Sequence, residues 1–222
     1  MSTKLRVKIC GLMAVTDAIQ AESAGANYGG MILSQGFSRS IPPETGREIS
    51  STVGISTVGV LVEEELEAAE SLANAAKVSV LQLHGKETLA YVKELSKRGD
   101  WTIWKVIVAR CRAEICCALE LWEPFVDGIV LDGWNPSFPG GTGTKFAWEE
   151  IGRLRDEFSG NVELVVAGGL NPSNVGDAIK HLDPDTVDVS SGVESRLGEK
   201  SRELMESFVV NARSTGCGKN GL

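Results

Sequence analysis

The chain has little histidine, no long apolar run and no paired cysteine spacing, and each absence excludes a class of protein. Two histidines among 222 residues cannot supply a histidine-based metal site or a serine triad. No apolar run approaches the roughly 20 residues that a membrane-spanning helix needs, and Met1 to Lys8 lacks the apolar stretch of a secretory signal. The five cysteines are odd in number and unpaired in spacing, which argues against a disulfide framework and favours a reducing cytoplasm.

Positive charge is also scarce. Lysine and arginine number 22 against 30 acidic residues, which gives a net charge of −8 and a pI near 4.9. Such a chain repels a nucleic-acid backbone, so we do not expect nucleic acid as a partner. The lack of a long apolar run argues against a membrane. The cysteines at 111, 116 and 117 have no matching ligand cluster, so zinc is not expected, and no motif for an organic cofactor occurs. An anionic small molecule would have to be bound by local amides.

What the chain does have is a regular alternation of two patterns. Apolar, β-branched runs read as buried parallel strands, and amphipathic stretches between them read as helices. The expected strands are Leu5–Cys10, Tyr28–Leu33, Thr57–Val62, Val78–Leu83, Trp101–Val108, Gly128–Leu131, Val162–Ala167 and Val187–Ser190. The expected helices include Ala14–Ser23, Glu63–Ala76, Glu87–Lys97, Trp148–Phe158, Ser173–His181 and Lys200–Ala212, with the weakest pattern at Arg112–Trp122.

Eight strand–helix pairs in one chain of this length predict an α/β fold, a single (β/α)8 TIM barrel. The competing fold, a doubly wound open sheet, carries its glycine fingerprint after the first strand, but here that strand runs into Cys10-Gly11-Leu12. No proline- or serine-rich linker divides the chain. We therefore predict one catalytic domain over residues 1–212, followed by a flexible polar tail over 213–222.

Three glycine-rich strings follow apolar runs in the second half of the chain. Consecutive amides without obstructing side chains form nests that favour phosphate. Loops of this kind after the last strands of a barrel predict a phosphate site at one end of the sheet. The strings are Gly140-Gly141-Thr142-Gly143, Ala167-Gly168-Gly169 and Ser190-Ser191-Gly192.

Two polar residues at strand ends suggest acid–base chemistry. Cys10 ends the first expected strand, and although a free cysteine is usually a small buried hydrophobe, the glycine that follows leaves space for a ligand. Lys8 projects from the same face and could either lower the thiol pKa or pair with a barrel carboxylate. Asp132 ends the sixth strand, where its alternative role is to cap a turn. Across a barrel mouth the two form a plausible base and acid.

Other strand-end residues suit substrate binding. Gln82 and His84 end the fourth strand, and His84 on the simpler reading is only a hydrogen-bonded strand-end histidine. Arg39 lies in the loop after the second strand, where a lone arginine is usually a solvated charge but its planar fork also suits a carboxylate.

These residues resemble the phosphoribosylanthranilate isomerase family of tryptophan biosynthesis. The matching strings run in the family's order over nearly the whole chain, and although each is weak alone, the set is specific. They are Lys8-Ile9-Cys10-Gly11, Gln82-Leu83-His84-Gly85, Leu131-Asp132, Gly140-Gly141-Thr142-Gly143, Phe146-x-Trp148, Ala167-Gly168-Gly169-Leu170 and Asp188-Val189-Ser190-Ser191-Gly192-Val193-Glu194.

The resemblance implies an Amadori rearrangement of N-(5-phosphoribosyl)anthranilate without a cofactor, in a monomer or a homodimer. It implies that Cys10 is the general base, Asp132 the general acid and Arg39 the partner of the anthranilate carboxylate. The family commonly has Ser-Pro-Arg where this chain has Phe37-Ser38-Arg39. The expected substrate-binding residues are Arg39, Gln82, His84, Gly141, Thr142, Gly143, Gly168, Gly169, Ser190, Ser191 and Gly192.

The same residues are compatible with two other functions. The histidine-pathway isomerase performs the same rearrangement on a substrate with two phosphates, but it has an aspartate after the first strand where this chain has Cys10. A barrel that only binds a sugar phosphate is the second rival. A thiol and a carboxylate at opposite strand ends favour an enzyme over a binder.

Overall fold

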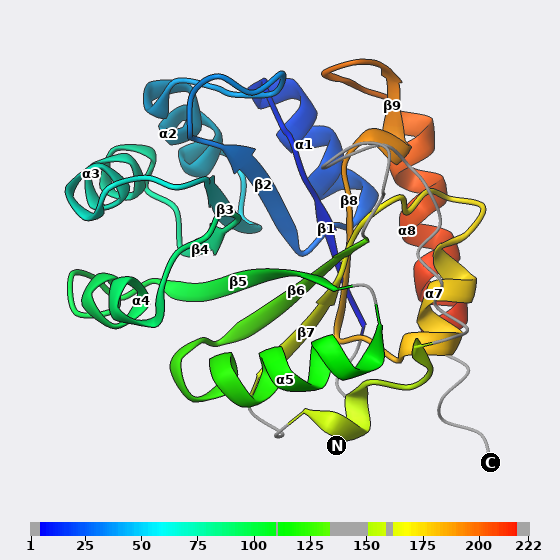
Figure 1. The fold of residues 1–222 in the computed structure, drawn as a ribbon. Coiled ribbons are helices and arrows are strands. Elements are labelled where there is room, and N and C mark those ends of the chain that lie inside the picture. The colour runs from blue at the N-terminus through cyan, green and yellow to red at the C-terminus, as the bar shows by residue number, and fades with distance from the viewer. Residues whose placement is uncertain (1–4, 110, 134–150, 159–161, 217–222) are drawn as a thin grey trace.

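The computed structural model describes residues 5–109, 111–133, 151–158 and 162–216, and its eight parallel strands close into one barrel (Figure 1). Strand β1 pairs with β2 on one side and with β8 on the other, which closes the sheet. The predicted (β/α)8 barrel is therefore confirmed. The strands are β1 (Arg6–Ile9), β2 (Tyr28–Ile32), β3 (Ser56–Leu61), β4 (Val80–Leu83), β5 (Thr102–Ala109), β6 (Gly128–Gly133), β7 (Glu163–Val166) and β8 (Thr186–Val189).

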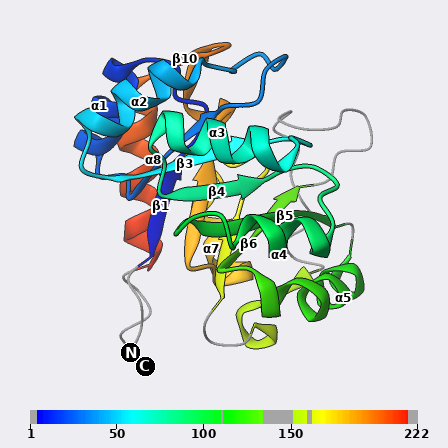
Figure 2. The ribbon, with the colours of Figure 1, turned by 90° about the vertical axis from the view of Figure 1, so that its left-hand side faces the viewer.

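Helices cover the outside of the barrel, and a small antiparallel hairpin follows β8 (Figures 1 and 2). The hairpin consists of β9 (Glu194–Arg196) and β10 (Glu199–Lys200). Short 3-10 helices lie at Glu123–Phe125, Arg155–Glu157 and Ser191–Val193. The α-helices are α1 (Val15–Ala24), α2 (Pro43–Thr52), α3 (Leu66–Ala76), α4 (Leu89–Leu95), α5 (Arg112–Trp122), α7 (Val175–Leu182) and α8 (Arg202–Gly216).

The core has two parts because successive strand residues point to opposite faces of the sheet. On β1, Val7 and Ile9 are fully buried against the helices, whereas Lys8 between them points into the barrel. The barrel interior has its own apolar cluster, in which Tyr28 and Trp104 meet edge to face with ring centroids 4.9 Å apart. Its buried members are Tyr28, Val58, Val80, Trp104, Val106, Val130 and Val165. This apolar cluster fills the barrel interior below the carboxyl ends of the strands.

Several predicted helix boundaries need correction. The helix expected from Glu63 starts only at Leu66, because Glu63 has a φ of 54° that no right-handed helix accepts. The helix expected over Trp148–Phe158 lies partly outside the described residues, and none of residues 152–158 is α-helical. Of the described residues in this range, only Ile151 is α-helical, and Gly152 has a φ of 68° that a right-handed helix does not accept.

Two further boundaries concern the weakest helix and the chain's end. The helix predicted over Arg112–Trp122 is confirmed with those bounds, despite its blurred apolar stripe. Helix α8 continues past the predicted end at Ala212 to Gly216, and Arg213 donates from Nη2 to the Gly25 carbonyl. Residues 213–216 of the predicted tail are therefore helical, and residues 217–222 lie outside the described residues. In that same part, no helix has the length and apolar character to cross a membrane.

Helix α8 offers a test of the outer core with an internal control. Phe208 is fully buried, whereas Val210 on the same helix is 60% exposed. We expect Phe208→Ala to lower the free energy of unfolding by about 3–5 kcal/mol, the cost of a cavity in a packed core. Val210→Ala should change it by no more than about 0.5 kcal/mol. Urea unfolding of both variants measures the difference, and equal losses would contradict this packing.

Candidate active site

A cavity of about 980 Å³ opens at the carboxyl ends of the strands, the end at which barrel enzymes place their active sites. The predicted site residues that the structure describes all line this cavity, with the exception of Gly192. Gly141, Thr142 and Gly143 lie outside the described residues. The residues brought together are Cys10, Arg39, Gln82, His84, Asp132, Gly168, Gly169, Ser190 and Ser191.

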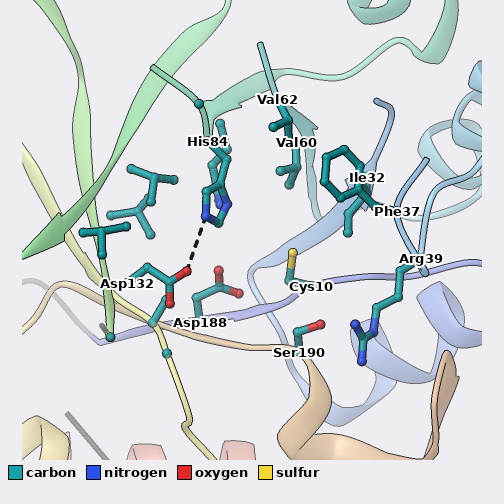
Figure 3. Close-up of a pocket in the computed structure, with 18 of the residues that line it drawn as sticks. Cys10, Ile32, Phe37, Arg39, Val60, Val62, His84, Asp132, Asp188 and Ser190 are labelled. Atoms are coloured by element: carbon teal, nitrogen blue, oxygen red, sulfur yellow. Dashed lines mark ion pairs between the residues drawn. The ribbon is translucent and has the colours of Figure 1, made fainter. Parts of the chain in front are cut away.

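The polar side chains of the cavity form two groups that face each other (Figure 3). Asp132, on β6, points toward His84, and the His84 Nε2 atom lies 3.4 Å from Asp132 Oδ2. Cys10, Ser190 and Arg39 lie on the other side. Asp188 lies between Asp132 and Cys10, and apolar side chains such as Val60 and Ile32 also line the cavity. An acid and a base placed in this way can act on different atoms of one bound molecule.

The cavity floor contains a buried ion pair. Lys8 Nζ donates to Asp188 Oδ2 at 2.7 Å and to Gln82 Oε1 at 2.9 Å, and the Lys8 side chain is fully buried. Burial by itself lowers the Lys8 pKa, but the attraction of Asp188 outweighs it and the net direction is upward. Both roles considered for Lys8 occur, since it pairs with the Asp188 carboxylate and also acts to lower the pKa of Cys10. Asp188 Oδ1 has no hydrogen-bond partner among the described residues, although Asp188 also lines the cavity.

Cys10 lies just beyond β1, where its backbone amide donates to the Val189 carbonyl at 2.8 Å. Gly30 on β2 leaves room for the thiol, since a Cβ at that position would lie 2.8 Å from Cys10 Sγ. Burial raises the pKa of the Cys10 thiol, and the nearby Lys8 and Lys200 counteract this only in part. The free protein therefore holds Cys10 as a thiol at neutral pH.

The loop that carries His84 is anchored from behind by a second buried ion pair. Lys105 Nζ lies 2.9 Å from Glu87 Oε2 and donates to the carbonyls of Leu83 and Gly85 at 3.3 and 2.7 Å. These carbonyls flank His84 in the chain. Because both partners are almost fully buried, the contacts restrict the backbone on either side of the histidine.

Arg39 reaches the cavity rim but already has a protein partner. Its Nε and Nη2 atoms donate to the two carboxylate oxygens of Glu194, each at 2.7 Å. Lys200 Nζ lies 2.8 Å from the same Glu194 carboxylate. Arg39 is thus an oriented, paired arginine rather than the solvated loop charge that a lone loop arginine usually is.

The glycine loops after β7 and β8 meet directly. Gly168 and Gly169 have φ of 83° and 68°, values that favour glycine. Gly192 has no room for a side chain, because a Cβ there would collide with the Leu170 carbonyl. The absence of a side chain at Gly192 therefore lets the two loops approach closely, and Gly192 itself does not line the cavity. The part of the chain that the structure describes contains no group of three or more His, Cys, Asp or Glu side chains that could hold a metal ion.

Sequence reasoning assigned no site role to Asp188, Glu194 or Lys105, although the first two stand in the matched string that runs from Asp188 to Glu194. Asp188 could have been found by strand alternation, because it precedes Ser190 by two residues on β8 and pairs in register with Lys8. Glu194 lies 155 positions from Arg39, and no local pattern connects them. Lys105 falls in an apolar strand run and gives no signal of its own partner.

A closed parallel barrel with an acid, a thiol and glycine loops at its carboxyl end belongs to the class of TIM-barrel enzymes. The family model "N-(5'phosphoribosyl)anthranilate (PRA) isomerase" matches residues 7–211. The N-(5'-phosphoribosyl)anthranilate isomerase of Moorella thermoacetica is 40% identical over 211 residues, which cover 94% of this chain and 90% of the relative. The chain belongs to the phosphoribosylanthranilate isomerase family.

Solved structures agree with this assignment. The crystal structure of phosphoribosyl anthranilate isomerase from Thermotoga maritima has a TM-score of 0.84 and 34% identity, and the match covers 95% of this chain and 99% of that one. A second is a phosphoribosyl anthranilate isomerase in complex with reduced 1-(o-carboxyphenylamino)-1-deoxyribulose 5-phosphate. It has a TM-score of 0.81 and 33% identity with the same coverage.

The buried pair under the cavity can be tested by stability. Lys8→Met leaves the Asp188 carboxylate buried without its cation, so we expect a loss of about 3–5 kcal/mol in the free energy of unfolding. Lys8→Met combined with Asp188→Leu should recover much of that loss, because no unpaired charge stays buried. Lys180→Met, at an exposed pair with Asp177, is the control and should cost about 0–1 kcal/mol. A double variant as unstable as the single one in urea would refute this account.

Proposed function

We propose that the chain converts N-(5-phosphoribosyl)anthranilate to 1-(2-carboxyphenylamino)-1-deoxyribulose 5-phosphate, with Asp132 as general acid and Cys10 as general base. The observation that carries the proposal is that Asp132 and Cys10 stand on facing sides of one cavity (Figure 3). Family membership supports the reaction, and the two side chains supply the proton transfers that it needs.

Asp132 acts first. Opening the furanose ring requires a proton on the ring oxygen as the bond from that oxygen to C1 breaks, and the product of this step is a protonated Schiff base. A carboxylic acid in a partly enclosed cavity is suited to deliver that proton. His84, 3.4 Å away, fixes the orientation of the Asp132 carboxyl group.

Cys10 acts second. The Schiff base makes the C2 proton acidic, and the Cys10 thiolate removes it to give an enolamine. Ketonisation then places a proton on C1 while the C2 hydroxyl loses its proton, so no net proton is consumed. Because burial raises the pKa of Cys10, the reactive thiolate becomes more abundant as pH rises above neutral.

The remaining cavity residues bind the two ends of the substrate. Arg39 faces the anthranilate carboxylate, because its planar fork binds carboxylates in two parallel hydrogen bonds. The amides around Gly169 and Ser191 hold the phosphate. Gly141 to Gly143, which the sequence predicts to bind the same group, lie outside the described residues. Gln82 and His84 contact the sugar. The cytoplasmic location and the monomeric or homodimeric state remain predictions from the sequence.

The loss of anthranilate fluorescence, followed with freshly generated phosphoribosylanthranilate, measures the reaction. A wild-type protein that binds the substrate without changing its fluorescence would support the binding-only alternative and defeat the proposal. Turnover by itself establishes the reaction but not the roles of the two residues.

The role of Cys10 is tested by Cys10→Ser. We expect folding and substrate binding to persist while kcat falls about 10²- to 10⁴-fold, the range for a lost acid–base group. In the wild type, the rate of Cys10 alkylation by iodoacetamide should reach its half-maximum at a higher pH than that of glutathione in the same tube, since its pKa is raised. Near-normal turnover by Cys10→Ser would leave Cys10 as a buried hydrophobe.

Asp132→Asn separates a catalytic acid from a turn-capping aspartate. The amide keeps the shape and the hydrogen bonding but cannot deliver a proton, so product affinity and Tm should be retained while kcat falls about 10²- to 10⁴-fold. A cap would show the reverse: a lower Tm with turnover per folded molecule intact. Product titration, thermal unfolding and the fluorescence assay on one sample distinguish these outcomes.

A further inference from the structure

Beside the cavity, one carboxylate holds two cations from distant parts of the chain. Glu194, at the start of β9, accepts both hydrogen bonds of Arg39 and also pairs with Lys200 of β10 at 2.8 Å. Lys200 donates in addition to the carbonyl of Ser190 at 3.0 Å. The hairpin after β8 thus connects the loop after β2 to the cavity wall.

The three side chains are largely withdrawn from water. The exposed fractions of Arg39, Glu194 and Lys200 are 14%, 5% and 0%. Burial acts to raise the pKa of Glu194, but the hydrogen bonds from Arg39 and Lys200 outweigh it and bring the pKa to about 2. Glu194 is therefore ionised at neutral pH. Burial lowers the pKa of Lys200, and its pair with Glu194 opposes this effect. With both cations charged, the cluster of two cations and one anion has an excess positive charge at the cavity rim.

The contact between Arg39 and Glu194 determines which guanidinium N–H groups remain available to a ligand. Glu194 occupies Nε and Nη2, and this bidentate contact fixes the plane of the guanidinium. The Nη1 atom has only a long contact of 3.4 Å with Ser38 Oγ among the described residues. The end edge of the guanidinium can accordingly donate to a second carboxylate without breaking the first pair.

We propose that Glu194 and Lys200 are positioning residues that make this Arg39 edge selective for a substrate with a carboxylate on its aromatic ring. Glu194 sets the orientation. Lys200 offsets the charge of Glu194, so that Arg39 stays attractive to an anion instead of being neutralised by its own partner. The inference rests on the proposed function, since it concerns how the same cavity recognises the anthranilate end of its substrate.

The test compares two substrates that differ by that one carboxylate, N-(5-phosphoribosyl)anthranilate and N-(5-phosphoribosyl)aniline. Glu194→Gln should lower kcat/KM for the anthranilate compound about 10- to 100-fold, mainly through KM, as expected when charge-assisted hydrogen bonds are lost. The aniline compound should change less than about threefold. Glu199→Gln, at an exposed position of the same hairpin, is the matched control and should change neither value.

Coupling to Arg39 supplies a readout that general damage to the fold would not give. In an Arg39→Ala background, Glu194→Gln should cause no further loss, because its effect passes through Arg39. If Glu194→Gln does not fold, Lys200→Met provides the test. It removes the excess positive charge but leaves Arg39 paired, so KM should rise about three- to tenfold for the anthranilate compound only.

Two outcomes would overturn the inference: equal losses for both substrates, or full additivity with Arg39→Ala. Failure of the proposed function looks different, because the wild-type protein would then turn over neither compound. Wild-type activity is therefore measured first on both.

Discussion

The Lys8–Asp188 ion pair is the contact on which the rest of the site depends. The two residues are in register across the seam at which β1 meets β8, and Lys8 also reaches Gln82 on β4 across the barrel. Below this pair the barrel is filled by valines and Trp104, and above it the cavity opens. An ammonium group without a partner could not remain at this depth. The pair thus lies between the apolar core of the barrel and the cavity that contains the proposed catalytic residues.

The same arrangement recurs at each functional element of the rim. A buried ion pair lies next to three of the cavity side chains: Lys8–Asp188 beneath Cys10, Lys105–Glu87 behind the His84 loop and Lys200–Glu194 behind Arg39. Such pairs contribute little net stability, because desolvation offsets their attraction. What they contribute is orientation, since each charged group has one low-energy arrangement in a dry environment. Precise placement of reacting groups is worth more to a catalyst than added stability.

Strand-level features could be predicted from the sequence because they follow from local periodicity. Alternation along β1 put Lys8 and Cys10 on one face, and the end of the β6 run put Asp132 at the rim, as the structure has them. Partners across the fold could not be predicted, since nothing near Arg39 indicates a carboxylate 155 positions later. Helix starts also failed where one backbone angle decides the outcome, as at Glu63 with its φ of 54°.

A chain with a net charge of −8 has to attract a substrate that carries a phosphate and a carboxylate. At physiological ionic strength, exposed charges are screened beyond about 8–10 Å, so the acidic surface acts weakly inside the cavity. Lys8, Lys200 and Arg39 lie close to the site in a poorly screened environment, and local charge outweighs net charge there. Only Lys8 and Lys200 are fully buried, and each is held by one carboxylate, which leaves the excess positive charge on Arg39 at the rim. In the proposed function, the substrate carboxylate lies against the positive charge of Arg39, while the Lys8–Asp188 pair keeps the cavity floor nearly neutral.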